Sequence, residues 1–473
     1  MKRIILFILL ITVGINSFAQ EAKLNIKSLN AKNNTVVIQI PVDGAWFYPA
    51  KKEIKFDADS TVNYSLKINK IAWLRINNNT VLIEPGTTRL VFDKGILVHS
   101  NKNNEGMLLF NKRNTEFYQY RARDYYKKDS TTAGLYQLLE NDKNEAVKPY
   151  TELFSKQKIS ANFYNEIKRY FSTEEVILEA AIPMIILSTK QKINSDLDKM
   201  WADAYKKHPI NNVKDAFYPD FYHHARYYAS TYLHYYLPLK KGKKPLEKSE
   251  DENLKNCYKS FEDNFSGKTK EYLLATFLYD EMLQSKYQRI LVDLFTSFKS
   301  SYPKSNFSPF LQPFADKILA YQKDIKKDYK ANEKFVANYY EINSLDSLMN
   351  RFKGKTVFVD IWATWCGPCK AEFEYSAGLE KFLQAKGVEM LFISMDKDVA
   401  DQRWKEMIKY YKLSGSHIRT NNALQKDLID RLWEGKGYAI PRYLIIKDGK
   451  LVVADALRPS DKEKLYAQIS KFL

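Results

Sequence analysis

Two of the chain's three cysteines, Cys366 and Cys369, stand three residues apart directly after an apolar segment. Cysteines at this spacing can bind a metal, form a permanent structural disulfide, or cycle between a dithiol and a disulfide. Zinc sites usually need four ligands, and the nearest downstream histidine, His417, has no second ligand beside it. A permanent disulfide across so short a loop removes little entropy from the unfolded chain. The spacing therefore favours a redox pair, and we expect neither a metal nor a cofactor.

The residues around the pair predict a buried strand followed by a helix. In "TVFVDIW" (356–362), apolar side chains fall on both faces, which is typical of a central strand. A helix is expected to begin near Cys366, where unpaired N–H groups and a partial positive charge stabilise a thiolate. Cysteines in such positions can have pKa values of about 3.5–7.5. We therefore expect Cys366 to attack and Cys369, one turn deeper, to resolve.

The segment "DIWATWCGPCK" resembles the active-site strand and motif of thioredoxin. The segments "WCGPCKAEF", "GVEMLFISMDKD" and "GYAIPRYLIIKDGKLV" are similar to the exported TlpA/ResA-like branch of that superfamily, of the Bacteroidetes type. The resemblance covers about residues 338–473. It implies a thioredoxin-like fold and an exported thiol–disulfide oxidoreductase, acting as a reductase of protein disulfides.

The resemblance also implies which residues contact a client. Pro441 matches the cis-proline that faces the disulfide, and Ile440 would offer its backbone to an extended substrate. Trp365, Gly367 and Pro368 border the cysteines and complete the expected substrate-binding set. Pro368 also lies in the first helical turn, where its missing N–H costs little.

Two acidic residues match functional positions of the family. Asp360 matches a buried carboxylate that helps to move the proton of the resolving thiol. A carboxyl within a doubly apolar strand should have a raised pKa, whereas the alternative is a hydrated residue at the strand end. Glu372 matches an acidic residue of ResA-like proteins, and the alternative is an ordinary solvated helix charge.

The sequence departs from the ResA-like pattern at two points. Glu374 stands where a proline often occurs, and Cys-Gly-Pro-Cys replaces the more usual Cys-Glu-Pro-Cys. Both departures point away from a dedicated role in cytochrome c maturation. The Gly-Pro pair favours the reducing end of the range, with a disulfide oxidase or isomerase as the nearest alternative.

The amino terminus predicts an export signal. Lys2 and Arg3 precede an apolar run from Ile4 to Ile15, and Ser17-Phe18-Ala19 provides small residues for cleavage. The alternative is an uncleaved anchor, although the run is short for a membrane-spanning helix. We expect a periplasmic or cell-envelope protein whose partners are a disulfide-containing client and, as the compartment and family imply, a membrane thiol transporter that donates electrons.

The remaining sequence predicts a multidomain chain. After the signal peptide (1–19), residues 20–100 predict an antiparallel β-sheet or sandwich, and residues 101–330 an α-helical domain. Residues 335–473 alternate strands and helices, which indicates an α/β domain. The polar segment 324–335 is the expected linker. Pro183 is expected to kink or split its helix, which should open at Ser172.

Composition and isolated residues exclude other functions. The formal charge of +18 comes from scattered lysines mixed with acids, so we expect no nucleic-acid partner. Three cysteines are too few for a framework of structural disulfides. We expect Cys257 to be a buried small apolar residue. The histidines His223, His224 and His234 fit a satisfied histidine–tyrosine network better than a metal site.

The region upstream of the motif leaves a second hypothesis open. The chain contains 33 tyrosines, and many of them lie in the helical region. Because aromatic side chains serve recognition well, residues 20–330 could bind one partner or a surface glycan, with the thioredoxin-like domain serving that complex.

Overall fold

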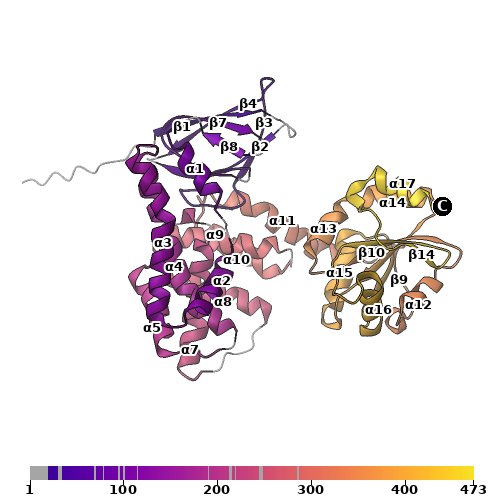
Figure 1. Ribbon diagram of the computed structural model, residues 1–473. Helices are drawn as coiled ribbons and strands as arrows, with labels where there is room; N and C mark the ends of the chain where they lie inside the picture. Colours follow the sequence, from indigo (N-terminus) through magenta and orange to yellow (C-terminus); the bar gives the residue numbers. More distant parts are fainter. Residues whose placement is uncertain are drawn as a thin grey trace, which may run out of the picture. The chain divides into compact units, whose positions relative to one another are not determined.

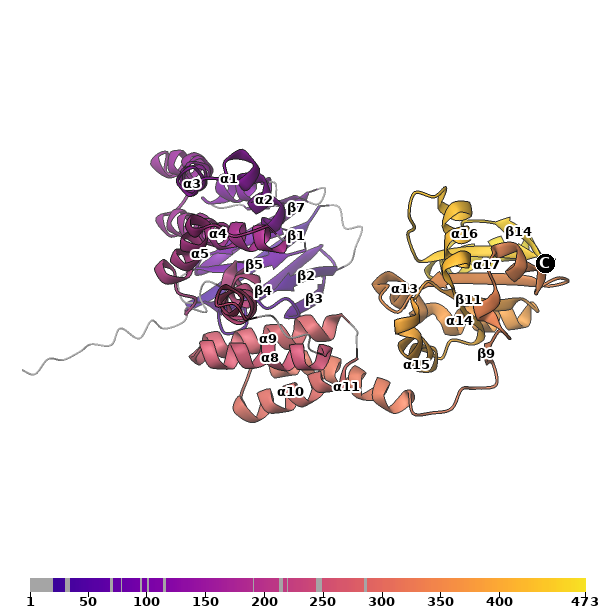
Figure 2. The same ribbon diagram turned by 90° about the horizontal axis from the view of Figure 1, so that it is seen from below.

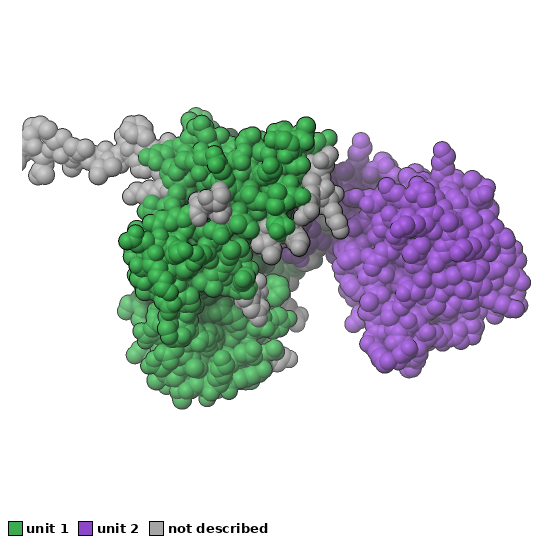
Figure 3. All heavy atoms as spheres, turned by 45° about the horizontal axis from the view of Figure 1, so that its top comes forward, with its two compact units in different colours: residues 1–280, 293–313 green, residues 281–292, 314–473 purple. Residues whose placement is uncertain are grey.

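The computed structural model describes most of residues 20–473. The ranges outside the description are 1–19, 30–34, 69–70, 78, 94–95, 100–101, 114–115, 190, 212–215, 219, 244–248 and 285–286. The predicted export signal therefore lies outside the described residues. The chain divides into two compact units, residues 1–280 with 293–313 and residues 281–292 with 314–473 (Figure 3). No helix within the described ranges is long and apolar enough to cross a membrane.

The first unit begins with two four-stranded sheets that share one apolar core. The core takes alternate residues from both sheets, including Leu24, Ile38, Leu74 and Leu90, as expected when sheets pack face to face. One sheet has the order β4 (Thr61–Ile68), β1 (Gln20–Ser28), β7 (Gly86–Asp93), β8 (Ile96–His99). The other has the order β3 (Lys51–Lys55), β2 (Thr35–Gln39), β5 (Ala72–Ile76), β6 (Asn79–Ile83).

One strand pair departs from the antiparallel arrangement that the sequence predicts. β1 and β7 run parallel, whereas the other described pairs of these two sheets are antiparallel. A parallel pair needs a long crossover connection, and β2 to β6 supply it between β1 and β7. Local turn signals cannot reveal such a pairing, because it joins segments that are far apart in the sequence.

Helices make up the rest of the first unit. The long helices α3 (Thr132–Ser155), α4 (Ala161–Ser188) and α5 (Ser195–Lys207) lie side by side (Figure 2). The remaining helical segments are α1 (Asn104–Asn111), α2 (Tyr118–Lys128), α6 (Phe221–Arg226), η2 (Tyr227–Tyr236), α7 (Leu237–Lys240), α8 (Glu250–Asn264), α9 (Gly267–Leu283), α10 (Arg289–Ser301) and α11 (Ser308–Asp324), of which the last three each have residues in both units.

Of the two predicted effects of Pro183, a kink or a split of its helix, the split is wrong. Helix α4 runs through this residue, and it begins at Ala161 rather than near Ser172. Ser160 caps it, since the Ser160 hydroxyl accepts a hydrogen bond from the backbone N–H of Phe163 at 3.1 Å. From Ile177 onward the helix is buried almost all round, and this packing offsets the hydrogen bond that proline removes.

The second unit contains a six-stranded sheet with β10 (Thr356–Trp362) near its centre. Helices α14 (Ser376–Ala385) and α17 (Glu463–Ser470) cover one face through Leu379 and Leu465, while α15 (Asp401–Tyr411) and α16 (Asn422–Trp433) lie on the other (Figure 1). The sheet order is β14 (Lys450–Val453), β13 (Arg442–Lys447), β10, β11 (Glu389–Ser394), β12 (Gly415–Arg419), β9 (Glu333–Phe335). Shorter elements are η3 (Tyr339–Glu341), α12 (Leu345–Asn350), η5 (Asp398–Ala400) and η6 (Pro459–Asp461).

This unit extends upstream of the boundary that the sequence predicts at residue 335. Part of the expected linker forms β9, an edge strand parallel to β12. The Tyr329 hydroxyl donates to the carbonyl oxygen of Lys405 at 3.3 Å, and the hydroxyls of Tyr287 and Tyr411 lie 2.8 Å apart. A strand of three residues is too short to give a readable alternation, so the sequence pattern could not show it.

Trp73 joins the first sandwich to its helices. Its indole N–H donates to Glu166 Oε1 at 3.0 Å, and its ring centroid lies 5.0 Å from that of Phe110 and 5.7 Å from that of Phe217. We predict that Trp73→Ala lowers the free energy of unfolding of this unit by about 3–5 kcal/mol, because it leaves a large cavity and removes one hydrogen bond to Glu166, which keeps its ion pair with Arg169.

Urea titration followed by circular dichroism measures this loss. Phe117→Ala is the control, since Phe117 is 71% exposed and its removal should cost less than about 0.5 kcal/mol. Equal unfolding midpoints for the two variants would contradict the assignment of Trp73.

Candidate redox site

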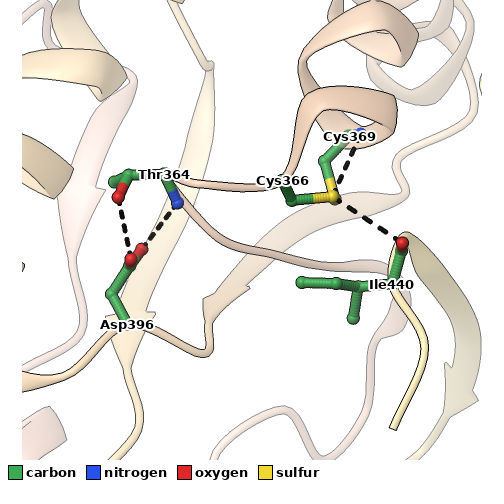
Figure 4. Close-up of a disulfide and its surroundings, with 5 residues drawn as sticks. All are labelled: Thr364, Cys366, Cys369, Asp396 and Ile440. Carbon is green, nitrogen blue, oxygen red and sulfur yellow. Dashed lines mark hydrogen bonds between the residues drawn. A yellow bond between two sulfur atoms is a disulfide. The ribbon is translucent and has the colours of Figure 1, made fainter. Parts of the chain in front are cut away.

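The strand that leads to the cysteines is buried along its whole length. All seven residues of β10 are buried, and the strand pairs with β11 on one side and β13 on the other. The turn after it is held by Asp396. The backbone N–H and hydroxyl of Thr364 donate to the two oxygens of Asp396, each at 2.8 Å (Figure 4). The hydroxyl of Ser394 donates to the same carboxylate at 2.8 Å. This anchor fixes the chain two residues before Cys366.

Cys366 and Cys369 are joined by a disulfide at the start of a helix. Cys366 is the N-cap of α13 (Gly367–Glu372), and the two Cα atoms lie 5.3 Å apart. The backbone N–H of Cys369 donates to Cys366 Sγ at 3.2 Å (Figure 4). When the disulfide opens, this N–H and the partial positive charge of the helix start favour an anionic Sγ on Cys366. The geometry agrees with an attacking sulfur at the helix start and a resolving sulfur one turn deeper.

The structure brings the expected substrate-contacting residues together around Cys366. Its Sγ lies 3.7 Å from the carbonyl oxygen of Ile440, and the Ile440–Pro441 peptide bond is cis (Figure 4). Gly367 and Pro368 are exposed, and a Cβ added to Gly367 would meet no atom within 4 Å. Residues larger than glycine would therefore fit at position 367 without a steric clash.

Two aromatic rings stand beside the disulfide. Trp365 is 57% exposed, and its ring centroid lies 6.3 Å from that of Tyr438. Tyr438 was not among the residues that the sequence pointed to, although it stands only two positions before Ile440 in "GYAIP".

Asp360 is 2% exposed, so the alternative of a hydrated strand end does not hold. Burial is the main cause that raises the pKa of its carboxyl well above the ordinary value, and the charge of Glu372 adds to it. Its Oδ1 has no hydrogen-bond partner among the described residues. A carboxyl with a raised pKa is a stronger base than an ordinary carboxylate, so it can take up and release a proton during a reaction.

Glu372 is 8% exposed, so it is not a solvated helix charge. Its carboxylate accepts hydrogen bonds from the backbone N–H of Ser460 at 2.9 Å and from the Ser460 hydroxyl at 3.0 Å. Ser460 lies in η6, and its partnership with Glu372 joins two segments 88 residues apart. The sequence motif indicated Glu372 as a site residue but did not indicate Ser460 as its hydrogen-bond partner.

Lys370 is a buried residue that sequence reasoning missed. Burial lowers the pKa of its ammonium to about 8, Arg403 lowers it further, and Asp396 opposes the shift. From the sequence alone, a lysine beside Cys369 at the start of a helix is predicted to be exposed. Its burial depends on how other elements pack around it, which the local sequence does not show.

The other cysteine and the histidines do not assemble into a metal site. Cys257 is partly buried, and its Sγ lies 2.9 Å from the hydroxyl of Ser230. Burial lowers the pKa of His224 to about 3 and that of His417 to about 4. His417 Nε2 lies 2.8 Å from the carbonyl oxygen of Leu413. Within the described ranges, no group of three His, Cys, Asp or Glu residues could hold a metal ion.

In a comparison with known protein families, the model of the Redoxin family matches residues 336–469. The thiol-disulfide oxidoreductase ResA of Bacillus thuringiensis subsp. konkukian is 33% identical over 129 residues, 25% of this chain and 65% of that protein. ResA of Bacillus subtilis is 43% identical over 47 residues, 10% of this chain and 26% of that protein. This chain thus spans about two thirds or less of the length of the curated relatives it matches.

A solved structure also matches this region. It is the thioredoxin domain of a thiol-disulfide oxidoreductase from Bacteroides vulgatus, 28% identical, with 26% of this chain and 82% of that chain covered and a TM-score of 0.22.

The buried state of Asp360 predicts a pH-dependent stability. Because its folded-state pKa is raised, the folded protein keeps a proton that the unfolded chain releases above about pH 4. The free energy of unfolding should therefore fall as pH rises toward the raised pKa, by at most about 1.4 kcal/mol per pH unit. We predict that Asp360→Asn removes this fall, so that its advantage over the wild type grows with pH.

Urea unfolding of the oxidised protein at several pH values measures the effect. Asp455→Asn serves as the matched control, since the Asp455 side chain is 74% exposed. Parallel pH profiles for the wild type and Asp360→Asn would show that Asp360 ionises normally in the folded protein.

Proposed function

We propose that this chain, whose residues 336–469 form a thioredoxin-superfamily domain of the ResA-like kind, is a thiol–disulfide oxidoreductase that reduces protein disulfides. The observation that carries the proposal is the Cys366–Cys369 disulfide at the start of α13, with the carbonyl of Ile440 beside it. Trp365, Gly367 and Pro368 are exposed beside the buried sulfur pair, so a client can contact the surface next to Cys366.

The reaction proceeds through two thiol–disulfide exchanges. In the reduced protein the Cys366 thiolate attacks one sulfur of a client disulfide; the client S–S bond breaks, a mixed disulfide forms, and the departing client sulfur takes a proton. Cys369 then loses its proton and attacks Cys366 Sγ. This releases the second client thiol and leaves the Cys366–Cys369 disulfide. The client gains two electrons and the protein loses two.

Asp360 and Glu372 support the second exchange. Asp360 can accept the proton that Cys369 releases, because burial raises the pKa of its carboxyl and so makes it a stronger base. Glu372, fixed by Ser460, places a negative charge near Asp360 and favours this protonated form. Ile440 and Pro441 hold the client backbone in an extended form beside Cys366.

The residues between the cysteines support the proposed direction of electron flow. Gly367-Pro368 matches the thioredoxin pair, which belongs to the reducing end of the range at about −270 mV, against about −120 mV for a strong oxidant. A potential near the oxidising end would instead identify a disulfide oxidase or isomerase.

The proposed compartment is the periplasm or cell envelope, reached through cleavage after Ala19. The apolar run of Ile4–Ile15 and the basic start of Lys2 and Arg3 support this. Outside the cytoplasm, the oxidised pair must be reduced by an external dithiol, and a membrane thiol transporter is the proposed electron donor.

A second candidate function concerns the first unit. Phe117 is 71% exposed and Tyr120 52% exposed, and their ring centroids lie 6.3 Å apart. Exposed aromatic pairs favour binding of a partner protein or glycan. Retention of a specific partner on the immobilised full chain, and its loss when Phe117 and Tyr120 are both changed to alanine, would support this function, and failure to retain one would count against it.

Substitution of each cysteine tests the proposed reaction. We predict that the wild type reduces insulin with dithiothreitol as electron source, and that Cys366→Ser reduces the rate to that without protein. Cys369→Ser should retain a client covalently on Cys366, because the resolving thiol is missing.

Cys257→Ser is the matched control, because Cys257 lies outside the proposed site. It should match the wild type in insulin reduction. Full activity of Cys366→Ser would overturn the proposal, as would equal trapping by Cys369→Ser and the wild type.

A further inference from the structure

A cavity of about 260 Å³ lies between α14 and the sheet of the second unit. The disulfide and the Ile440–Pro441 segment do not line it, so it is distinct from the proposed client-binding surface. Exposed residues at its outer part include Asn332, Lys334 and Gln384, whereas its inner part is buried. The cavity is therefore a recess that leads from the surface toward β10. Its apolar lining includes Leu379, Leu383, Val388, Met390 and Phe392.

Two buried carboxyls line the inner part of this cavity. Glu372 already accepts two hydrogen bonds from Ser460. Asp360, by contrast, is 2% exposed and its Oδ1 has no partner among the described residues. A buried polar atom without a partner carries an unfavourable desolvation cost, which a ligand that donates a hydrogen bond would relieve.

Acidic side chains outnumber basic ones in the lining, which favours a cationic ligand over an anionic one. The lining contains four carboxyl side chains, those of Asp360, Glu372, Glu380 and Glu389, against the single ammonium of Lys334. Glu380 is engaged by the side-chain amides of Asn332 and Gln384, and Glu389 pairs with Lys355. Asp360 is thus the carboxyl that remains for a ligand.

We propose that this cavity binds a small primary amine with an apolar body of about six carbons. The apolar walls would bury the hydrocarbon, and the ammonium group would donate to Asp360. The volume exceeds the about 150 Å³ of an apolar cavity that admits benzene, so a body of this size fits. A carboxylic acid would meet the like charge of the lining, and a neutral alcohol would lack the attraction between opposite charges in a low-dielectric site.

Occupancy by an amine should be linked to protonation of Asp360. The titratable groups that face Asp360 are Glu372 from α13 and Tyr443 from β13, and Lys334, Glu380 and Glu389 line the same cavity. An ammonium group binds the ionised carboxyl better than the neutral one. Affinity for an amine should therefore rise with pH as Asp360 loses its proton, while affinity for a neutral ligand should not.

Calorimetric titration of the oxidised, full-length protein tests the site. We use hexylamine, 1-hexanol and hexanoate near pH 5 and near pH 8, where an alkylammonium with a pKa of about 10 keeps its charge. Hexylamine should bind more tightly at the higher pH, where a larger fraction of Asp360 is ionised; a tenfold rise in affinity corresponds to a coupling of about 1.4 kcal/mol. Hexanol should bind more weakly without a pH dependence, and hexanoate should not bind.

Two variants show where the amine binds. Asp360→Asn should keep the weak, pH-independent binding of the hydrocarbon and lose the rise with pH. Leu383→Trp should fill the cavity and abolish binding of hexylamine and hexanol. Thermal unfolding verifies that each variant folds, and methyl NMR shifts of Met390 in the wild type report occupancy independently of the variants.

The possible results distinguish failure of the site from failure of the proposed ligand class. The site is refuted if hexylamine fails to saturate at millimolar concentrations or leaves the Met390 signal unmoved. Equal binding of hexylamine and hexanoate would refute the amine as the ligand class, as would an unchanged pH dependence in Asp360→Asn. Because the readout is binding to the oxidised protein, these outcomes do not depend on whether the chain reduces insulin.

Discussion

The first turn of α13 determines what this protein can do, because it places one sulfur at the start of a helix and the other one turn behind it. Cys366 caps the helix, and the N–H of Cys369 points at its sulfur at 3.2 Å. The stability of an anionic sulfur at this position depends on the orientation of the turn. The orientation in turn depends on buried strand β10 and on the hydrogen bonds from Thr364 to Asp396. A rigid sheet and a polar anchor thus position one reactive atom.

The arrangement has an energetic cost at Asp360, a carboxyl in the buried strand β10. Asp360 stands in a fully buried strand, where an ionised carboxyl is unfavourable, and burial raises its pKa. A purely structural role would be better served by an apolar residue at this position. The neighbouring Glu372 accepts two hydrogen bonds from Ser460, whereas Oδ1 of Asp360 has no partner among the described residues. A carboxyl with a strongly perturbed pKa is typical of sites that move protons.

The sequence predicted the parts of the second unit whose signals are local. The strand β10, the helix start at Cys366 and the alternation of later strands and helices follow from apolar pattern and from the cysteine spacing. What it missed depends on contacts between distant segments. The edge strand β9 has three residues, Glu372 meets Ser460 from 88 residues away, and the burial of Lys370 arises from elements packed around it. In the first unit, Pro183 stays helical because tertiary packing outweighs its local preference.

The account rests on the claim that the helix start makes Cys366 a nucleophile near neutral pH, and the alkylation rate of Cys366 tests this most directly. The measurement uses iodoacetamide on the reduced Cys369→Ser variant, with Cys257→Ser added to remove the other thiol, across a pH series. The account predicts half-maximal reactivity below about pH 7.5, as for cysteines at helix starts. Half-maximal reactivity near about pH 8.5, the value of an unperturbed cysteine, would contradict it.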